Sequence, residues 1–201
     1  MVITAKNLTK KYDGRIVLDK VSFEAESHSR ILISGDSGEG KTTLLRIIMG
    51  LEKPDEGSIS FSPASLIVKN IRIGVSFQED RLCEEQSAFM NVKLVNKGLT
   101  DEEIVKELTR LLDEEDIYKP VSELSGGMRK RVSVVRACAS DRDIYIMDEP
   151  FSGLDKNNSR KTAEYIRRKT AEGILLLTTH VKDNPELLDD FKVLNKKKKK
   201  I

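Results

Sequence analysis

Long apolar runs are missing from this sequence. The longest are four residues each, Ile144–Met147 and Ile174–Leu177, whereas a helix needs about 20 apolar residues to cross a bilayer. The N-terminus, Met1–Lys6, also lacks the basic-then-apolar pattern of a secretory signal. We therefore expect no membrane span in this chain. If the protein works at a membrane, another chain must supply the spanning part.

Cysteines are equally scarce, with only Cys83 and Cys138 and no CxxC spacing. Two cysteines in unrelated contexts argue against a disulfide framework and against a metal-binding pair. This pattern favours a reducing, cytosolic compartment. We expect both thiols to be free, with Cys138 buried on a helix that follows Leu124–Met128.

The sequence also has little excess charge. Its formal net charge is +2, and five positive charges lie in Lys196–Lys200, so the rest of the chain is slightly acidic. A nucleic-acid-binding protein would show a basic patch on its folded body, and this chain predicts none. The lysine run is expected to be a solvated tail, with attraction to anionic lipid as the alternative.

The 201 residues, 38% hydrophobic and 34% charged, are typical of one folded domain. β-Branched and aromatic residues predict strands, and apolar residues at helical spacing predict helices. The expected strands are Val2–Leu8, Ile16–Ala25, Arg30–Ser34, Ser58–Phe61, Ile71–Phe77, Ile144–Met147 and Ile174–Thr178; helices are expected from Lys41, over Asn158–Lys169 and after Pro185.

This alternation predicts an α/β fold with a mainly parallel sheet, an N-terminal antiparallel β part and an inserted helical subdomain. The chain is expected to form a single domain over residues 1–201, with its core at about 1–81 and 122–201 and the helical subdomain at about 82–121. In the helical block, Thr100 and Glu103 form a predicted capping box. An apolar stripe follows it at Ile104, Val105, Leu108, Leu111 and Leu112.

A glycine-rich motif, Gly35-Asp36-Ser37-Gly38-Glu39-Gly40-Lys41-Thr42, matches the pattern GxxxxGK[ST]. Its context fits a phosphate-binding loop, because an apolar strand precedes it and a predicted helix follows it. Glycines let successive backbone N–H groups turn toward a phosphate, and the helix N-terminus adds a favourable dipole. We expect Lys41 to reach the β- and γ-phosphates of ATP and the Thr42 hydroxyl to bind Mg²⁺.

Two adjacent carboxylates, Asp148 and Glu149, end the apolar strand Ile144–Met147. Ligands bind at the carboxyl ends of strands in open α/β sheets. Asp148 is expected on the Mg²⁺ side of the site, and Glu149 is expected to activate water.

A third motif, Leu124-Ser125-Gly126-Gly127-Met128, precedes a predicted helix. Serine and two glycines at a helix start can form an anion-binding nest. No obvious ligand in this chain belongs to it, and an ordinary flexible turn is the alternative.

Taken in order, these elements resemble the ABC ATPases over nearly the whole chain. Four further features match the family pattern: Tyr12, Gln78, Ser152-Gly153-Leu154-Asp155 and His180. Tyr12 could otherwise be a strand-end aromatic, and His180 could be a surface histidine.

The resemblance implies an ATP-hydrolysing domain that pairs head to tail with a second nucleotide-binding domain. Tyr12 would stack on adenine, and ATP would bind Gly35, Asp36, Ser37, Gly38, Glu39, Gly40, Lys41, Thr42 and Thr43. Ser125, Gly126 and Gly127 would cover the ATP of the partner, with Asp155 at the dimer seam. Catalysis is implied for Glu149, for His180 at the γ-phosphate and for Gln78, and the metal ligands would be Thr42, Gln78 and Asp148.

Two residues depart from the commonest pattern, in that Met128 and Lys130 stand where glutamines are frequent. Met128, together with Phe77–Leu82, resembles the importer ATPases for nitrate, sulfonates and taurine. That resemblance implies integral membrane permease subunits as partners, with a solute-binding protein as an optional further component. It also implies a cytoplasmic protein, peripheral on the inner face of the cell membrane.

Three other functions compete with a transporter ATPase. A soluble ABC protein of repair or translation usually has coiled-coil insertions or two nucleotide domains. A regulatory module without turnover commonly lacks the carboxylate found here at Glu149. A P-loop kinase lacks the motif Leu124–Gly127. The transported solute, the direction of transport and the choice between homodimer and heterodimer stay open.

Overall fold

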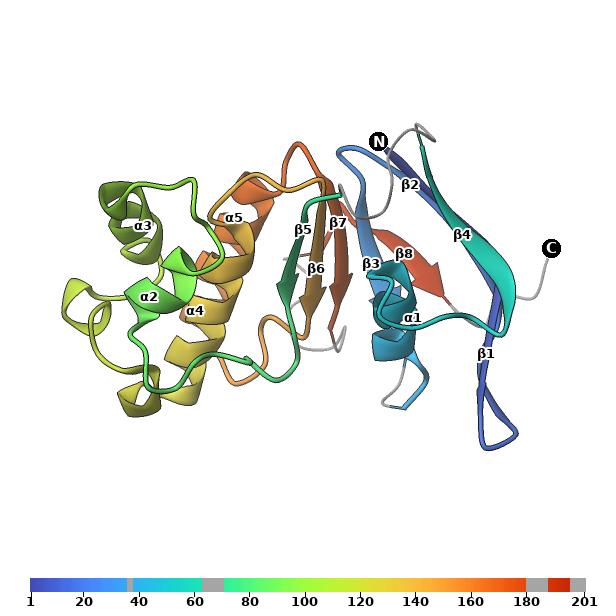
Figure 1. Cartoon of the computed structure of the whole chain (residues 1–201), viewed down its shortest axis with the longest axis horizontal. Helices are drawn as coiled ribbons and strands as arrows, with labels where there is room; N and C mark the ends of the chain where they lie inside the picture. The colour runs from blue at the N-terminus through green and yellow to red at the C-terminus, as the bar shows by residue number, and fades with distance from the viewer. Residues whose placement is uncertain (36–37, 63–70, 180–187, 196–201) are drawn as a thin grey trace.

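A five-stranded parallel sheet forms the centre of the fold (Figure 1). The computed structural model describes residues 1–35, 38–62, 71–179 and 188–195. The strand order is β5-β6-β7-β3-β8, and every neighbouring pair is parallel. The strands are β3 Arg30–Ser34, β5 Ile73–Ser76, β6 Ile144–Asp148, β7 Ile174–Thr178 and β8 Lys192–Asn195.

A second, antiparallel sheet has the order β2-β1-β4. Its strands are β1 Val2–Tyr12, β2 Arg15–Glu26 and β4 Glu56–Ser62. Asp13 and Gly14 join β1 to β2 with φ angles of 48° and 77°. Two positive φ values in a two-residue turn match the twist of the flanking strands. The two sheets confirm the expected α/β fold, with its mainly parallel sheet and its N-terminal antiparallel part.

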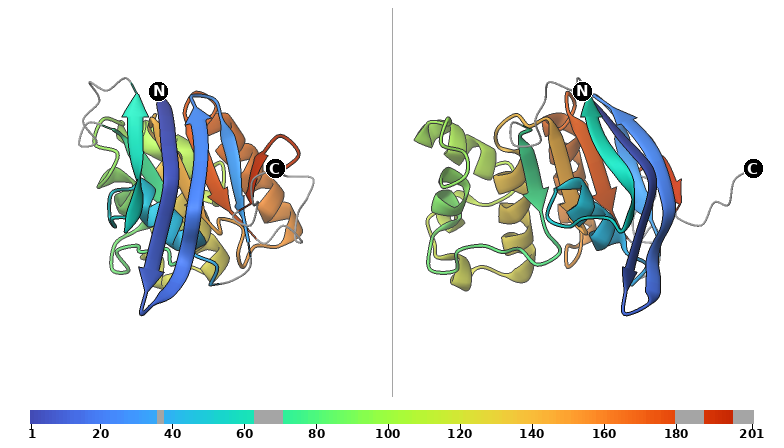
Figure 2. Two further views of the ribbon diagram at one scale, coloured as in Figure 1. Left: turned by 90° about the vertical axis from the view of Figure 1, so that its right-hand side faces the viewer. Right: turned by 45° about the vertical axis from the view of Figure 1, so that its right-hand side comes forward.

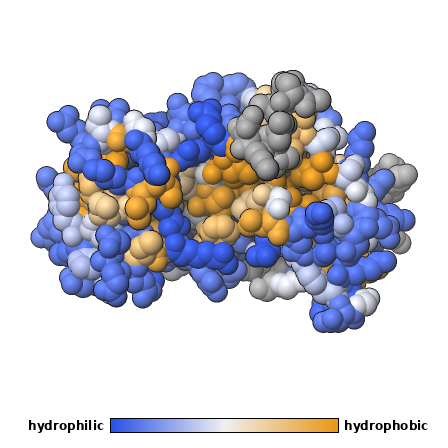
Figure 3. All heavy atoms as spheres, in the orientation of Figure 1, coloured by the Kyte–Doolittle hydropathy of each residue, from blue (hydrophilic) through white to orange (hydrophobic). Residues whose placement is uncertain are grey.

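The central strands are buried on both faces, which explains their continuous apolar sequences. Along β6, Ile144 and Ile146 pack toward the antiparallel sheet, whereas Tyr145 and Met147 pack toward the helices. Helix α1, Lys41–Ile48, fills the space between the two sheets (Figure 2). On the face shown in Figure 3, apolar side chains gather over the middle of the molecule, with smaller apolar patches over the helical part at the left.

Helices cover the opposite face of the parallel sheet. They are α2 Ala88–Lys93, α3 Asp101–Leu108, α4 Gly126–Cys138 and α5 Lys156–Lys169, with short 3₁₀ turns at Glu114–Asp116 and Val121–Glu123. The capping box of Thr100 and Glu103 is confirmed, with both reciprocal hydrogen bonds present. Of the apolar stripe, all but the partly buried Val105 lie in the core.

Helix α4 joins the helical part to the sheet, because it packs on α2 and α3 and also on β5. The division at residues 81 and 122 stays a prediction. Both cysteines are free, as expected, and Cys138 is buried on α4. Burial raises the pKa of the Cys138 thiol. No helix in the described part of the chain is long and apolar enough to cross a bilayer.

Strand β8 was not among the expected strands. Its four residues, Lys192–Asn195, pair with β3 at the edge of the parallel sheet. Edge strands are often short and charged, so their sequences carry a weak strand signal. The helix expected after Pro185 begins outside the described residues, and Leu188–Phe191, which the structure describes, form a turn.

Candidate active site

The phosphate loop connects β3 to α1 and brings its backbone close to strand β2. Gly40 has φ of 80°, and a Cβ atom at Gly40 would lie 2.5 Å from Cγ1 of Val17. Only glycine fits this position without a shift of β2. Helix α1 then starts at Lys41 with no acidic residue in its first turn, so its N-terminus can accept an anion.

Lys41 is buried, with 8% of its surface exposed. Its Nζ donates a hydrogen bond to the carbonyl oxygen of Gly35 across the loop, at 2.7 Å. The carboxylate of Glu39 also lies beside Gly35, and Gly38 takes a left-handed backbone with φ of 77°. The ammonium group of Lys41 therefore lies within the loop that the sequence predicts to bind phosphate.

Asp148 lies at the carboxyl end of β6 and is 4% exposed. Its Oδ2 accepts a hydrogen bond from Oγ1 of Thr42 at 3.0 Å, and its Oδ1 accepts one from Oγ1 of Thr178 at 2.6 Å. Two of the three residues predicted to bind Mg²⁺, Thr42 and Asp148, therefore lie side by side although 106 positions separate them, and the third, Gln78, lines the same cavity. A hydroxyl and a carboxylate oxygen fit Mg²⁺, which prefers oxygen ligands and keeps several waters.

Glu149 follows directly, with a left-handed backbone at φ of 52° and 8% exposure. Its backbone N–H donates to both the carbonyl oxygen and Oγ1 of Thr178, each at 3.1 Å. A non-glycine residue in this conformation is unusual and is often found at functional sites. The turn lets Asp148 and Glu149, neighbours in sequence, both line one cavity.

That cavity has a volume of about 310 Å³. It is lined by residues from both sheets and α1: Tyr12, Val17, Gly38, Gly40, Lys41, Thr42, Thr43, Gln78, Asp148 and Glu149. Tyr12 is 42% exposed, and its hydroxyl donates a hydrogen bond to Glu52. Partial burial and the Glu52 carboxylate raise the pKa of Tyr12, so the phenol stays neutral. One side of the cavity is thus aromatic and the other carries the cation and the carboxylates.

Ser125, Gly126 and Gly127 lie at the start of α4. None of the three lines this cavity. Ser125 and Gly126 are exposed, and Oγ of Ser125 caps the helix by accepting from the N–H of Met128 at 3.3 Å. Gly127 packs against the turn that contains Gly153 and Leu154. Asp155, next in that turn, caps α5 by accepting from the N–H of Asn158 at 2.8 Å.

Three predicted site residues, Asp36, Ser37 and His180, lie outside the described residues. Two residues of the site were missed by the sequence analysis. Thr178 orients both Asp148 and Glu149, and Val17 packs on Gly40. The available signal for Thr178 was its place at the end of a buried strand beside the predicted His180. Val17 carries no such signal.

Comparisons with known proteins show which sequences and folds this chain resembles. The sequence is 34% identical to the Nod factor export ATP-binding protein I of Sinorhizobium fredii, covering 94% of this chain and 59% of that protein. It is 35% identical to the sulfate/thiosulfate import ATP-binding protein CysA of Bacillus cereus, covering 94% and 57%. It is 32% identical to the spermidine/putrescine import ATP-binding protein PotA of Mycoplasma capricolum, covering 83% and 50%. The chain therefore spans between half and three fifths of these relatives.

Solved structures show the same fold. A dimeric ATP-binding cassette in a post-hydrolysis state, bound to ADP and Pi, superimposes with a TM-score of 0.80 at 23% identity, covering 96% of this chain and 94% of that one. The ATP-binding subunit of an ABC transporter superimposes with a TM-score of 0.81 at 24% identity, covering 98% and 87%. A sequence profile of the ABC transporter family matches residues 18–152, more than half of the chain. The chain therefore belongs to the ABC transporter family.

Proposed function

We propose that this chain binds and hydrolyses ATP and thereby energises an ABC membrane transporter. One observation carries the proposal: the phosphate loop, the Thr42–Asp148 pair and Glu149 surround a single cavity. A cation, a hard-metal site and a buried carboxylate at one cavity are the parts that phosphoryl transfer to water needs. ATP and Mg²⁺ are the ligands that the proposal requires.

In the proposed reaction, Lys41 and the N–H groups at the start of α1 hold the β- and γ-phosphates. Thr42, Gln78 and Asp148 would hold Mg²⁺, which would neutralise phosphate charge. Glu149 accepts the proton of the attacking water, and Thr178 keeps the Glu149 backbone in place through two hydrogen bonds. Tyr12 stacks on adenine at the mouth of the cavity, and His180 contacts the γ-phosphate.

We propose that the active unit is a head-to-tail dimer. The exposed start of α4 at Ser125 and Gly126 lies outside the cavity of its own chain, yet it presents N–H groups suited to an anion. A second chain that supplies its ATP to Ser125, Gly126 and Gly127 would give this nest a ligand. Asp155, in the turn packed beside Gly127, would then lie at the seam.

The purified chain is expected to hydrolyse ATP to ADP and phosphate only when Mg²⁺ is present. Replacing Lys41 by Ala should lower ATP affinity by about tenfold or more, because charge-assisted hydrogen bonds contribute about 1.5–3 kcal/mol. Phosphate release and ATP-dependent thermal stabilisation measure the two effects. Lys97→Ala, at an exposed lysine, is the matched control. An undiminished thermal shift in Lys41→Ala would contradict the assignment of the phosphate loop.

The proposed partners are permease subunits in the membrane, with a solute-binding protein as a further component if the direction is import. Leu94, Val95 and Tyr118 expose apolar side chains on the helical part, at 48%, 52% and 61%. Exposed apolar surface is typical of a protein-docking face. The importer assignment rests on the resemblance of Leu124–Met128 and Phe77–Leu82 to importer ATPases. In this proposal the chain is cytoplasmic and lies on the inner face of the membrane.

A tagged chain purified from detergent-solubilised membranes should recover a multispanning protein in a fixed ratio. Aspartate at both Leu94 and Val95 should weaken this recovery several-fold while the ATPase activity of the free chain is kept. Val193→Asp, at a side chain of similar exposure on β8, serves as the control. Recovery of no membrane protein would favour the soluble ABC class, and solute efflux by the complex would contradict import.

A further inference from the structure

Lys130 lies on α4 and is 5% exposed, although lysine is rarely buried without a partner. Its Nζ donates to the carbonyl oxygens of Phe77 and Gln78, at 3.1 and 2.7 Å. It also lies 2.8 Å from Oδ1 of Asp80. An ammonium group has three donors, and here three oxygens of one loop surround it. Lys130, which stands where the family pattern frequently has glutamine, therefore binds the loop that contains Gln78.

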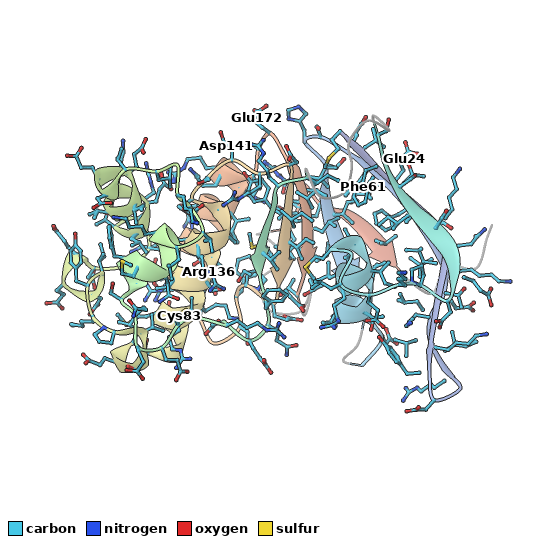
Figure 4. All side chains as sticks on the ribbon, in the orientation of Figure 1. Glu24, Phe61, Cys83, Arg136, Asp141 and Glu172 are labelled. Carbon is cyan, nitrogen blue, oxygen red and sulfur yellow. The ribbon has the colours of Figure 1, made fainter. Side chains whose placement is uncertain are left out.

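Arg136 extends this contact about one and two thirds turns further along α4. Its guanidinium donates to the carbonyl oxygens of Arg81 and Asp80, at 2.7 and 2.8 Å. Figure 4 labels Arg136 on α4. At the start of the same loop, the buried hydroxyls of Ser76 and Ser133 share a hydrogen bond of 3.0 Å.

The loop has little else to hold it. Within the described part of the chain, residues 78–81 make no backbone–backbone hydrogen bond. Their carbonyl oxygens at Gln78, Asp80 and Arg81 accept from the two α4 cations instead. Hydrogen bonds from two cations therefore tie this loop to α4.

We propose that Lys130 is a positioning residue, which fixes Gln78 to α4 so that the start of this helix and Gln78 move as one body. The inference rests on the proposed function, in which Ser125 covers the ATP of the partner and Gln78 serves the ATP of its own chain. Lys130 lies five positions after Ser125, about 7.5 Å along a helix axis. Closure of Ser125 over the ATP of the partner would thereby fix the position of Gln78 in the ATP site of its own chain. Arg136 supports this linkage from the far end of the loop.

The first test replaces Lys130 by Met, which keeps the length of the side chain and removes its donors. ATP affinity should change less than about twofold, because Lys130 does not line the cavity. The kcat for ATP should fall by about tenfold to a hundredfold, in the range seen when a catalytic group is displaced. The Hill coefficient for ATP should fall toward 1, and Lys130→Arg, which keeps donors, should recover part of both quantities.

Loss of Lys130 leaves the Asp80 carboxylate without its cation, which can destabilise the fold. The double variant Lys130→Met with Asp80→Asn removes both charges and is expected to fold with the same kinetic defect. Lys169→Met is the matched control, because Nζ of Lys169 also binds a backbone carbonyl of this region, that of Ala139, at 3.1 Å. This control should lose stability only.

Tryptic cleavage after Arg81, measured without nucleotide, gives a readout independent of activity. The cleavage rate should rise at least about tenfold in Lys130→Met and stay unchanged in Lys169→Met, because cleavage requires local opening of the loop. An unchanged cleavage rate in Lys130→Met, or wild-type kcat and Hill coefficient in the folded double variant, would overturn the inference. A wild-type chain without ATPase activity would refute the proposed function instead, and the cleavage rate would still decide whether Lys130 holds the loop.

Discussion

Replacing Glu149 by Gln should remove nearly all ATP hydrolysis while Mg-ATP still binds. The amide keeps the shape of the side chain but cannot accept a proton from water, and general-base catalysis is worth about 10²–10⁴-fold. The backbone bonds of Glu149 to Thr178 do not involve the carboxylate, so the turn should persist in the variant. Single-turnover phosphate release measures the loss.

Because the variant binds ATP without consuming it, it should also accumulate as an ATP-bound dimer in size-exclusion chromatography. Glu164→Gln is the control, since Glu164 forms an exposed i,i+4 pair with Arg160 on α5. Asp148→Asn provides a contrast, because it removes a proposed metal ligand and should weaken Mg²⁺ dependence rather than proton transfer. Wild-type steady-state turnover in Glu149→Gln would exclude Glu149 from the mechanism.

Replacing Ser125 by Arg should abolish hydrolysis and leave ATP binding by the monomer almost intact. Ser125 is exposed and lies outside the cavity of its own chain, so a bulky cation there cannot obstruct that cavity. It would instead block the approach of a second chain to the start of α4. The loss of the helix cap should cost about 1 kcal/mol of stability, which urea unfolding can measure separately.

Ser122→Arg, three residues earlier and also exposed, is the control and should retain activity. The decisive measurement is the specific activity of the wild-type chain against its concentration. A shared site predicts that specific activity rises through the range in which dimers form. Flat specific activity from below to above this range, with the protein monomeric throughout, would refute the head-to-tail dimer.

Several parts of the site were predictable because their chemistry is local in the sequence. The phosphate loop needs glycines at fixed spacing before a lysine and a helix, and Gly40 shows why, since any side chain would strike Val17. Asp148 and Glu149 follow a buried strand, so the carboxyl edge of the sheet was their expected place. The capping box at Thr100 is likewise a contact across three residues.

Other parts depend on contacts between distant segments. Thr178 orients Glu149 from the neighbouring strand, 29 positions away in the sequence. Lys130 binds the carbonyl oxygen of Gln78, which lies 52 positions earlier in the sequence. Strand β8 is short and polar, and it forms because β3 offers an unpaired edge.

The sequence by itself determined the class of fold and the position of the predicted phosphate loop between a strand and a helix, because strand burial, helix starts and glycine turns are encoded within a few neighbouring positions. Only the tertiary structure decided that Ser125 lies outside the cavity of its own chain, that one threonine binds both the Asp148 carboxylate and the backbone N–H of Glu149, and that a buried lysine binds the carbonyl oxygen of Gln78 from α4. The physical reason is that hydrogen bonds between segments depend on how the sheet order brings those segments together, and no local spacing carries that order.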